Sequence, residues 1–219
     1  MTDGIILIDK PAEMTSFGVV ARIRRVLTQA AQKKVKVGHT GTLDPFATGL
    51  MILVIGKECK NAEQYSKLDK VYEATFLLGQ ISTTGDPEGE LTEVSNRQPT
   101  ADEIEAALAK FKGPIMQRPP IFSAIKIDGK RAYKLARDGQ EVEIPERQIT
   151  VHSLDMIDYS YPNLRIRTHV SSGTYIRSLG VDIGAVLGTG AYCTTLRRLK
   201  IAQYTIADAQ QLADFGISN

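Results

Sequence analysis

One carboxylate, Asp44, lies in a loop whose residue types could position it for chemistry. Residues 38–50 (GHTGTLDPFATGL) contain three glycines and one proline, and the apolar run MILVI follows directly. Proline disfavours the helical conformation in the residue before it, so we expect an extended Asp44, while Gly41 and Gly49 could supply left-handed backbone. Such a loop could hold a nucleophile or a general base. Aspartate also favours turns and helix caps, so the pattern leaves an ordinary turn equally open.

Other common chemical motifs do not fit the sequence. A P-loop ends in Gly-Lys followed by Ser or Thr, whereas Gly49 is followed by Leu50, and the dinucleotide fingerprint Gly-x-Gly-x-x-Gly is absent from this segment. The two cysteines, Cys59 and Cys193, lack the spacing of metal ligands, so we expect reduced thiols and no zinc site. The sequence therefore predicts neither a cofactor nor a metal.

The amino-acid sequence of this loop is similar to a motif of one enzyme family. Gly-His-Thr-Gly-x-Leu-Asp-Pro-x-Ala-Thr-Gly resembles the nucleophile motif of the pseudouridine synthase B family, whose members act on uridine in the T-loop of tRNA. The resemblance continues along most of the chain, in residues 4–11, 119–133, 173–179 and 196–198. It implies an isomerase that converts uridine to pseudouridine at position 55 of tRNA, in the cytoplasm and without a cofactor.

The resemblance assigns catalysis to three residues. Asp44 would act on the sugar as nucleophile or base, and Arg177 would pair with it and keep it ionised. Tyr72 would stack on the target base and assist removal of its proton. From the residue types alone, Arg177 could also be a surface arginine at the start of a helix, and Tyr72 an ordinary strand aromatic.

Three further residues would contact the substrate if the resemblance holds. Tyr175 resembles a second tyrosine that contacts the substrate, and Leu196 resembles an apolar contact to the uracil. His39 would fill the space left by the flipped nucleotide and would be neither an acid nor a base. A lone histidine in a loop is otherwise more often a local hydrogen-bond partner than a catalyst.

The distribution of charge along the chain says more than its net value of +2. Basic residues are in excess in residues 1–60 and 111–150, and acidic residues in residues 73–110. A cluster of six cations is a candidate contact region for RNA phosphates, or else a solvated helix face. Its members are Arg22, Arg24, Arg25, Lys33, Lys34 and Lys36.

The expected elements mix helices and strands without strict βαβ alternation. We expect helices at residues 16–27, 101–111, 131–137, 174–187 and 207–215. We expect strands at residues 5–8, 50–55, 70–78, 122–127, 147–159, 164–170 and 202–206. Thr100 and Glu103 form a capping box for the second helix. The pattern predicts the α+β class with a mostly antiparallel sheet, and the resemblance implies a pseudouridine synthase fold with a mixed central sheet flanked by helices and loops.

We expect one catalytic domain over residues 1–219, with an RNA-gripping loop near residues 119–145. Bacterial members of the family commonly carry a further PUA-type domain, which we expect to be absent because the chain ends soon after its Leu-Arg-Arg segment. The expected partner is the T-arm stem-loop of tRNA. We expect a monomer with no obligatory protein partner and no membrane association, since no apolar run is long enough to span a bilayer.

Three other functions remain open. Relatives from archaea and eukaryotes modify uridine inside guide-RNA particles, so the same chemistry could serve another target. The protein could instead be an RNA-binding or tRNA-folding chaperone with secondary catalysis. A glycoside hydrolase would normally need a second carboxylic acid beside Asp44, and no second acid stands near it in the sequence.

Overall fold

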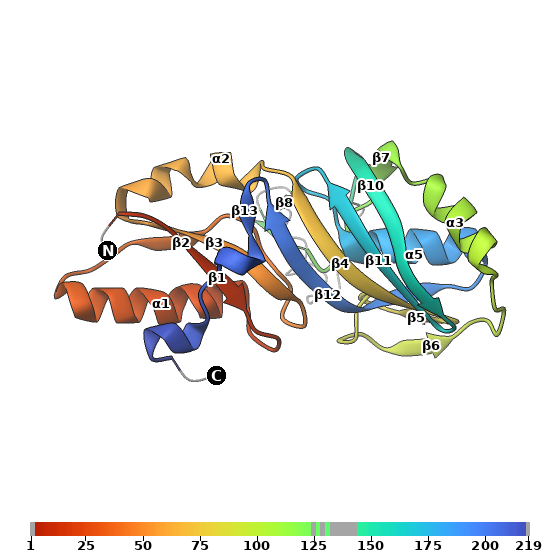
Figure 1. The fold of residues 1–219 in the computed structure, drawn as a ribbon, viewed down its shortest axis with the longest axis horizontal. Coiled ribbons are helices and arrows are strands. Elements are labelled where there is room, and N and C mark those ends of the chain that lie inside the picture. The colour runs from red at the N-terminus through yellow and green to blue at the C-terminus, as the bar shows by residue number, and fades with distance from the viewer. Residues whose placement is uncertain (1–2, 124–125, 128–129, 132–143, 218–219) are drawn as a thin grey trace. The chain divides into compact units, whose positions relative to one another are not determined.

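The computed structural model describes residues 3–123, 126–127, 130–131 and 144–217. The chain forms two compact units (Figure 1), of which the first comprises Met1–Glu73 with Leu196–Asn219 and the second Ala74–Thr195. Strands β4 (Lys70–Leu78) and β12 (Ala191–Ile201) contribute residues to both units. In the described part of the chain, no helix combines the length and the apolar character that crossing a membrane requires.

The first unit is built around strand β3, whose neighbours β1 and β2 are both antiparallel to it. The end of β12 is parallel to β3, with Arg197 opposite Thr48 and Arg198 opposite Gly49, and β13 pairs with β12. Besides its parts of β4 and β12, this unit contains β1 (Gly4–Lys10), α1 (Ser16–Ala31), β2 (Val37–His39), β3 (Thr48–Ile55), η1 (Gly56–Asn61), α2 (Ala62–Ser66), β13 (Tyr204–Thr205), η2 (Ile206–Asp208) and η3 (Leu212–Phe215).

Local sequence explains the main elements of this unit. Every residue of β3 after Thr48 is buried, as expected for a continuous apolar strand with partners on both edges. Leu50 and Ile52 of this strand pack with Ile201 in a hydrophobic cluster. Helix α1 is capped by Thr15, whose side chain accepts a hydrogen bond from the Gly18 N–H, and it buries one apolar face.

The second unit contains a sheet in which β12, β4, β11, β10 and β7 are neighbours in that order. Strand β10 is antiparallel to both β11 and β7. Gly180 of helix α5 packs against the ring of Phe76, where a Cβ atom would lie 2.6 Å from ring atoms. Besides its parts of β4 and β12, this unit contains β5 (Gln80–Ser82), β6 (Leu91–Glu93), α3 (Ala101–Ala109), β7 (Gly113–Gln117), β8 (Lys126–Ile127), β9 (Lys130–Arg131), β10 (Arg147–Ser160), β11 (Asn163–Val170) and α5 (Ile176–Leu187).

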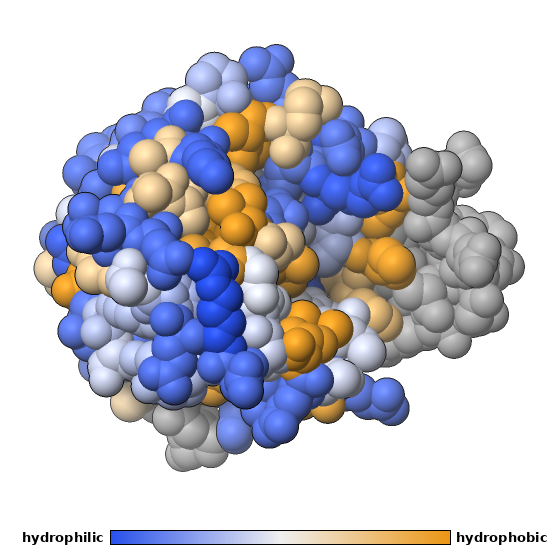
Figure 2. Space-filling view, turned by 90° about the vertical axis from the view of Figure 1, so that its right-hand side faces the viewer, coloured by the Kyte–Doolittle hydropathy of each residue, from blue (hydrophilic) through white to orange (hydrophobic). Residues whose placement is uncertain are grey.

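Exposed apolar side chains are scattered over the face of the molecule drawn in Figure 2, where hydrophobic groups are separated by hydrophilic ones. Among the large apolar residues of the second unit that the structure describes, Met116 has the highest exposed fraction, 58%. Single exposed apolar residues of this kind are normal for protein surfaces.

The predicted α+β class with a mixed, mostly antiparallel sheet and flanking helices is confirmed. The predicted strand at 202–206 is confirmed only at Tyr204–Thr205, because the long strand β12 ends at Ile201 and a turn separates the two strands. The predicted last helix at 207–215 consists of short 3-10 turns. Among the described residues of the expected strand at 122–127, residues 126–127 are strand and 122–123 are not. The expected helix at 131–137 and most of the gripping loop near 119–145 lie outside the described residues.

Candidate active site

Asp44 lies in the loop that joins β2 to β3, in the first unit, and its side chain is half-buried. The residue before it, Leu43, is held by the buried side chain of Ser16 at the start of α1. The Ser16 Oγ accepts a hydrogen bond from the Leu43 N–H at 2.8 Å and donates one to the Leu43 carbonyl at 2.9 Å. The Ala47 N–H donates to the Asp44 carbonyl, so the loop backbone also forms a turn.

Two buried cations hold the same loop on either side of Asp44. The Lys10 Nζ donates to the Pro45 carbonyl at 3.0 Å, and the Arg198 Nη2 donates to the Gly41 carbonyl at 3.1 Å. Their exposed fractions are 0% and 1%. A buried charge needs hydrogen-bond partners to offset its lost hydration, so these carbonyls and cations stabilise each other. The backbone around Asp44 is therefore fixed on both sides.

Gly49, at the end of the loop, is required by the pairing of β3 with β12. Its φ is +107°, and a Cβ atom there would lie 2.3 Å from the Arg198 carbonyl oxygen. Only glycine tolerates both the left-handed backbone and so close an approach. Gly41 differs, because its φ is not positive and a Cβ atom would meet only the Arg198 Nη1, at 3.5 Å. Of the two predicted special glycines, the structure supports Gly49.

The first unit also carries three of the predicted substrate residues. His39 ends β2 and is half-buried, while Tyr72 on β4 and Leu196 on β12 are each 7% exposed. Leu196 precedes the residue that pairs with Thr48, so it lies close in register to the end of the Asp44 loop. The structure thus brings His39, Tyr72 and Leu196 into the same unit as Asp44.

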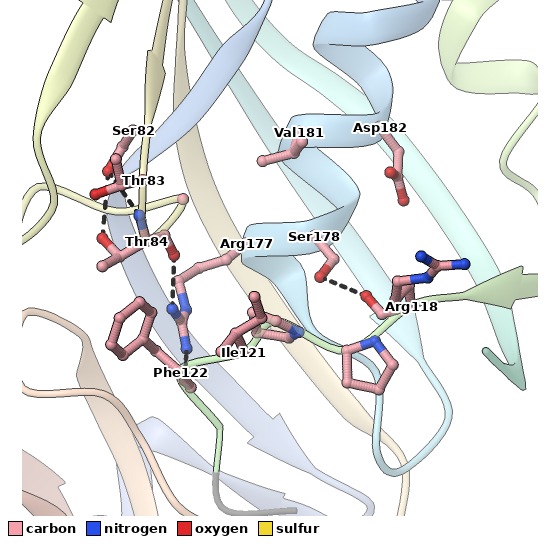
Figure 3. Close-up of a pocket in the computed structure, with 13 residues that line it drawn as sticks. Ser82, Thr83, Thr84, Arg118, Ile121, Phe122, Arg177, Ser178, Val181 and Asp182 are labelled. Atoms are coloured by element: carbon pink, nitrogen blue, oxygen red, sulfur yellow. Dashed lines mark hydrogen bonds between the residues drawn. The ribbon is translucent and has the colours of Figure 1, made fainter. Parts of the chain in front are cut away.

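Arg177 belongs to the second unit, in the first turn of α5, and is only 4% exposed, so the alternative of a surface arginine is wrong. Its Nη1 lies 3.0 Å from the Asp86 Oδ2 and donates to the Thr84 carbonyl at 2.8 Å. Its Nη2 donates to the Phe122 carbonyl at 2.8 Å (Figure 3). The guanidinium is therefore held in one orientation by oxygen atoms from two loops.

Asp86 is a residue that the sequence analysis missed. It is 4% exposed, and its Oδ1 accepts hydrogen bonds from the Thr84 hydroxyl at 2.6 Å and from the Glu88 N–H at 3.0 Å. These bonds, with the Arg177 ion pair, satisfy both carboxylate oxygens. The available signal was an aspartate in a turn of threonines and glycines, which is too common a pattern to distinguish a buried charge from a surface loop.

Tyr175, the residue before α5, is also held from several sides. The buried Gln117 side chain accepts from the Tyr175 N–H at 2.8 Å and donates to the Tyr175 carbonyl at 3.0 Å. The guanidinium carbon of Arg147 lies 5.1 Å from the centroid of the tyrosine ring, within cation–π range. Arg147 also donates to the Gly173 carbonyl.

The predicted pairing of Arg177 with Asp44 joins two different units and stays a prediction.

Lys70, at the start of β4, adds an unusual charge to the first unit. The pKa of its ammonium is lowered to about 8, mainly by burial and then by the neighbouring Arg198, while Asp69 acts in the opposite direction. The Lys70 Nζ donates to the Ser66 carbonyl at 2.7 Å and to the Leu68 carbonyl. Lys70 is thus a second buried cation near Arg198, which itself binds the Gly41 carbonyl of the Asp44 loop.

Comparison with known proteins gives the class of the protein, a pseudouridylate synthase. The family model described as TruB family pseudouridylate synthase (N terminal domain) matches residues 24–176. The chain belongs to the TruB family.

Named relatives align with nearly the whole length of this chain. It is 43% identical to the tRNA pseudouridine synthase B of Aromatoleum aromaticum, over 97% of this chain and 67% of the relative. It is 46% identical to the tRNA pseudouridine synthase B of Desulfotalea psychrophila, over 95% of this chain and 85% of the relative.

A solved structure of a Cbf5-Nop10-Gar1 complex contains a chain of similar fold, with a TM-score of 0.75 and 28% sequence identity. The match covers 97% of this chain and 53% of that one. The present chain therefore spans about half the length of this structural relative.

Proposed function

We propose that this protein converts uridine to pseudouridine at position 55, in the T-loop of tRNA, and that Asp44 is its nucleophile or base. Family membership and relatives that are named tRNA pseudouridine synthase B support the reaction. The observation that carries the assignment of Asp44 is the fixed loop around it, whose backbone is bound by Lys10, Ser16 and Arg198. Catalysis by a positioned group requires such a pre-formed backbone.

The target base lies inside a folded RNA loop, so the enzyme must flip it out of its stack. Unstacking costs a few kcal/mol, and stacking on an aromatic side chain returns about 1–3 kcal/mol. Tyr72 supplies the stacking face, and Leu196 and Tyr175 supply further contacts to the base. His39 occupies the space that the flipped nucleotide leaves.

The chemistry breaks the N1–C1′ glycosidic bond and forms a C5–C1′ bond. A carboxylate can attack C1′ or act as a base toward the sugar, and Asp44 takes one of these roles. The freed uracil rotates in the pocket, bonds through C5 and loses the C5 proton, while N1 gains a proton. Substrate and product have the same atoms, so the reaction consumes neither an oxidant nor water.

Arg177 keeps Asp44 ionised in this proposal. A guanidinium can donate two parallel hydrogen bonds to a carboxylate. Its contacts with Asp86 and with the Thr84 and Phe122 carbonyls fix its plane before any substrate binds. Replacement of Arg177 by Lys would keep the charge and lose this geometry. Near-normal turnover by that variant would argue against the pairing with Asp44.

The test of the proposal compares Asp44→Asn with a matched change of an exposed aspartate, Asp102→Asn on α3. Pseudouridine is mapped in an unmodified T-arm stem-loop after incubation with each protein. We expect no product from Asp44→Asn, retained binding of the stem-loop, and normal product from Asp102→Asn. Substantial pseudouridine formation by Asp44→Asn would overturn the assignment.

The same assay separates this function from its alternatives. We propose a monomeric cytoplasmic enzyme that needs no guide RNA, so wild-type protein should modify a naked stem-loop. Activity that appears only with a guide RNA would favour the particle-bound alternative. Restoration of tRNA folding in cells by the Asp44→Asn variant would reveal a chaperone role in addition to catalysis.

A further inference from the structure

A second charged region of the first unit takes no part in the chemistry proposed above. We call it the α1 basic surface, and its six residues are all exposed. They are Arg22, Arg24, Arg25, Lys33, Lys34 and Lys36. The sequence contains no aspartate or glutamate between Met14 and Leu43, so the surface is unopposed along this stretch of chain.

The middle of the α1 basic surface is hollowed. Arg24, Arg25 and Lys34 line an open hollow of about 520 Å³ together with Ala21, Thr28 and Gln29. The two uncharged polar side chains can donate hydrogen bonds, as side chains that contact phosphate oxygens commonly do. A cationic hollow with neutral donors in its lining fits a chain of phosphates better than a single small anion.

The backbone after α1 folds back to build this hollow. Gln32 adopts the left-handed conformation (φ 51°) and its N–H donates to the Gln29 carbonyl, which ends the helix. The Val35 N–H then donates to the Thr28 hydroxyl at 3.2 Å, and the Val35 side chain is buried. This turn places Lys34 next to the helix arginines, so the concentration of charge is built into the fold.

Within the described residues these cations make few contacts that could stabilise the fold: Arg22 donates a hydrogen bond to the Gly18 carbonyl at 3.3 Å, and Arg24 lies near the Phe17 ring. No basic residue occupies the last turn of α1, where a cation would favour the helix dipole. None of the six forms an ion pair with a described carboxylate. Unrelieved repulsion between neighbouring cations costs free energy, so an external anion explains them better than folding does.

An aromatic side chain extends the surface. Phe17 is 63% exposed, and the guanidinium carbon of Arg24 lies 6.0 Å from its ring centroid. An exposed aromatic next to cations is a common arrangement in proteins that bind nucleic acids, where the ring contacts a base or sugar. A phospholipid surface would use the same charges, but this surface offers Phe17 as its one large exposed apolar side chain among the described residues of α1.

We propose that the α1 basic surface binds the phosphate backbone of the substrate tRNA outside the T-loop, as a contact independent of base sequence. This rests on the proposed function. Lys36 directly precedes β2, and β2 leads through His39 into the Asp44 loop. Ser16, at the start of the same helix, binds Leu43. One rigid helix therefore connects the phosphate contact to the loop that carries the nucleophile.

The test compares two triple variants that each remove three positive charges. The first variant removes the three cations that line the hollow and is Arg24→Gln/Arg25→Gln/Lys34→Gln. The control removes three exposed lysines elsewhere and is Lys67→Gln/Lys110→Gln/Lys112→Gln. Affinity for unmodified full-length tRNA is measured by filter binding over a range of NaCl concentrations, with urea unfolding as a check on folding. We expect the first variant to bind about tenfold or more weakly at low salt, with its log K against log[salt] slope reduced by about 2–3.

Turnover provides an independent readout, because saturating tRNA should restore the rate of the first variant while its KM stays raised. The control should match the wild-type protein within twofold. Equal affinity and slope for the first variant and the wild type, or an equal loss in the control, would overturn the proposal. The proposal would also be overturned if the first variant lost affinity only for vesicles of phosphatidylcholine and phosphatidylserine and kept its affinity for tRNA. Wild-type pseudouridine formation on the same tRNA is measured alongside, so failure of the proposed function is recognised separately.

Discussion

Ser16 and Leu43 exchange two hydrogen bonds, at 2.8 and 2.9 Å, although 27 positions separate them in the sequence. Both residues are buried, so neither bond can be replaced by water without a cavity. The pair fixes the first turn of α1 to the residue immediately before Asp44. The Ser16 hydroxyl thus binds both the N–H and the carbonyl of Leu43, and in this way helps to position the proposed nucleophile.

Replacement of Ser16 by Ala should damage both stability and catalysis. It leaves the Leu43 N–H and carbonyl buried without this partner, which costs about 1–3 kcal/mol of unfolding free energy. A displacement of Asp44 of about 1 Å should lower kcat by roughly 100-fold. Single-turnover assays on a T-arm stem-loop and urea unfolding measure the two effects.

The neighbouring Thr15→Ala is the control for this prediction. It removes the cap bond to the Gly18 N–H and costs about 1 kcal/mol, but it leaves Leu43 untouched. Its kcat should stay within about twofold of the wild-type value. An equal fall of kcat in both variants would show that stability, and not the position of Asp44, sets the rate.

Gly49→Ala and Gly41→Ala should behave differently, although both change a glycine of the same loop. At Gly49 the new Cβ atom meets the Arg198 carbonyl at 2.3 Å on a backbone with φ of +107°, so β3 and β12 must separate. Overpacking and backbone strain together predict a loss of about 3 kcal/mol or more. At Gly41 the nearest atom is 3.5 Å away, and we expect a change below about 1 kcal/mol. Urea unfolding measures the free energy of unfolding of both variants. Equal losses would contradict the interpretation that the loop requires glycine at position 49 and not at position 41.

Local pattern was sufficient for several elements of the fold. The capping box of Thr100 and Glu103 is present as predicted, and the alternating strand Lys70–Leu78 has the predicted bounds. Strand β12 was missed because its sequence AYCTTLRRLKI has no clean alternation and includes the buried Arg198. An arginine inside a sheet becomes understandable only when the Leu50 and Gly41 carbonyls that accept its hydrogen bonds are known.

The contacts that position the Asp44 loop were predictable only in part. Glycines, a proline and one carboxylate identify the Asp44 loop from the sequence, because those residue types act locally. The side chains that hold the loop come from segments far apart in the chain, namely Lys10, Ser16 and Arg198. Asp86 was not found for the same reason, since its buried partner Arg177 belongs to a different element. Tertiary pairing of charges has no signature in a single sequence.

Two aspartates that contact or belong to α5 should respond in opposite ways to replacement by Asn. Asp86→Asn removes the carboxylate of a buried ion pair and leaves Arg177 with the Thr84 and Phe122 carbonyls, which should cost about 3 kcal/mol or more. For Asp182, burial raises the pKa of the carboxyl and nearby Glu146 acts in the same direction, so the ionised form is less favourable in the folded than in the unfolded protein.

Asp182→Asn removes the partly buried charge that burial and Glu146 disfavour, so it should leave stability at pH 7 unchanged or higher. Urea unfolding at pH 7 compares the two variants, and turnover should fall only in Asp86→Asn, where the orientation of Arg177 is lost. A larger destabilisation by Asp182→Asn than by Asp86→Asn would reverse this interpretation of the two carboxylates.

Lys70 should make stability depend on pH in the alkaline range. Its pKa is about 8 in the folded protein, lowered from 10.5 mainly by burial and then by Arg198. Between these two values the unfolded chain holds a proton that the folded chain has lost, so the free energy of unfolding rises with pH through this window. Below pH 8 both states are protonated and the folded state carries the full cost of the buried charge. The shift corresponds to about 3 kcal/mol.

Lys70→Met removes this titration, so the stability of the wild-type protein relative to the variant should increase by up to about 3 kcal/mol between pH 8 and pH 10.5. Urea unfolding of both proteins at pH 7.5, 8.5 and 9.5 measures the difference. Lys67→Met is the matched control, because the Lys67 side chain is 71% exposed and its removal should leave the pH profile parallel to that of the wild type. Parallel profiles for Lys70→Met as well would mean that the Lys70 ammonium stays charged throughout this range, held by the Ser66 and Leu68 carbonyls.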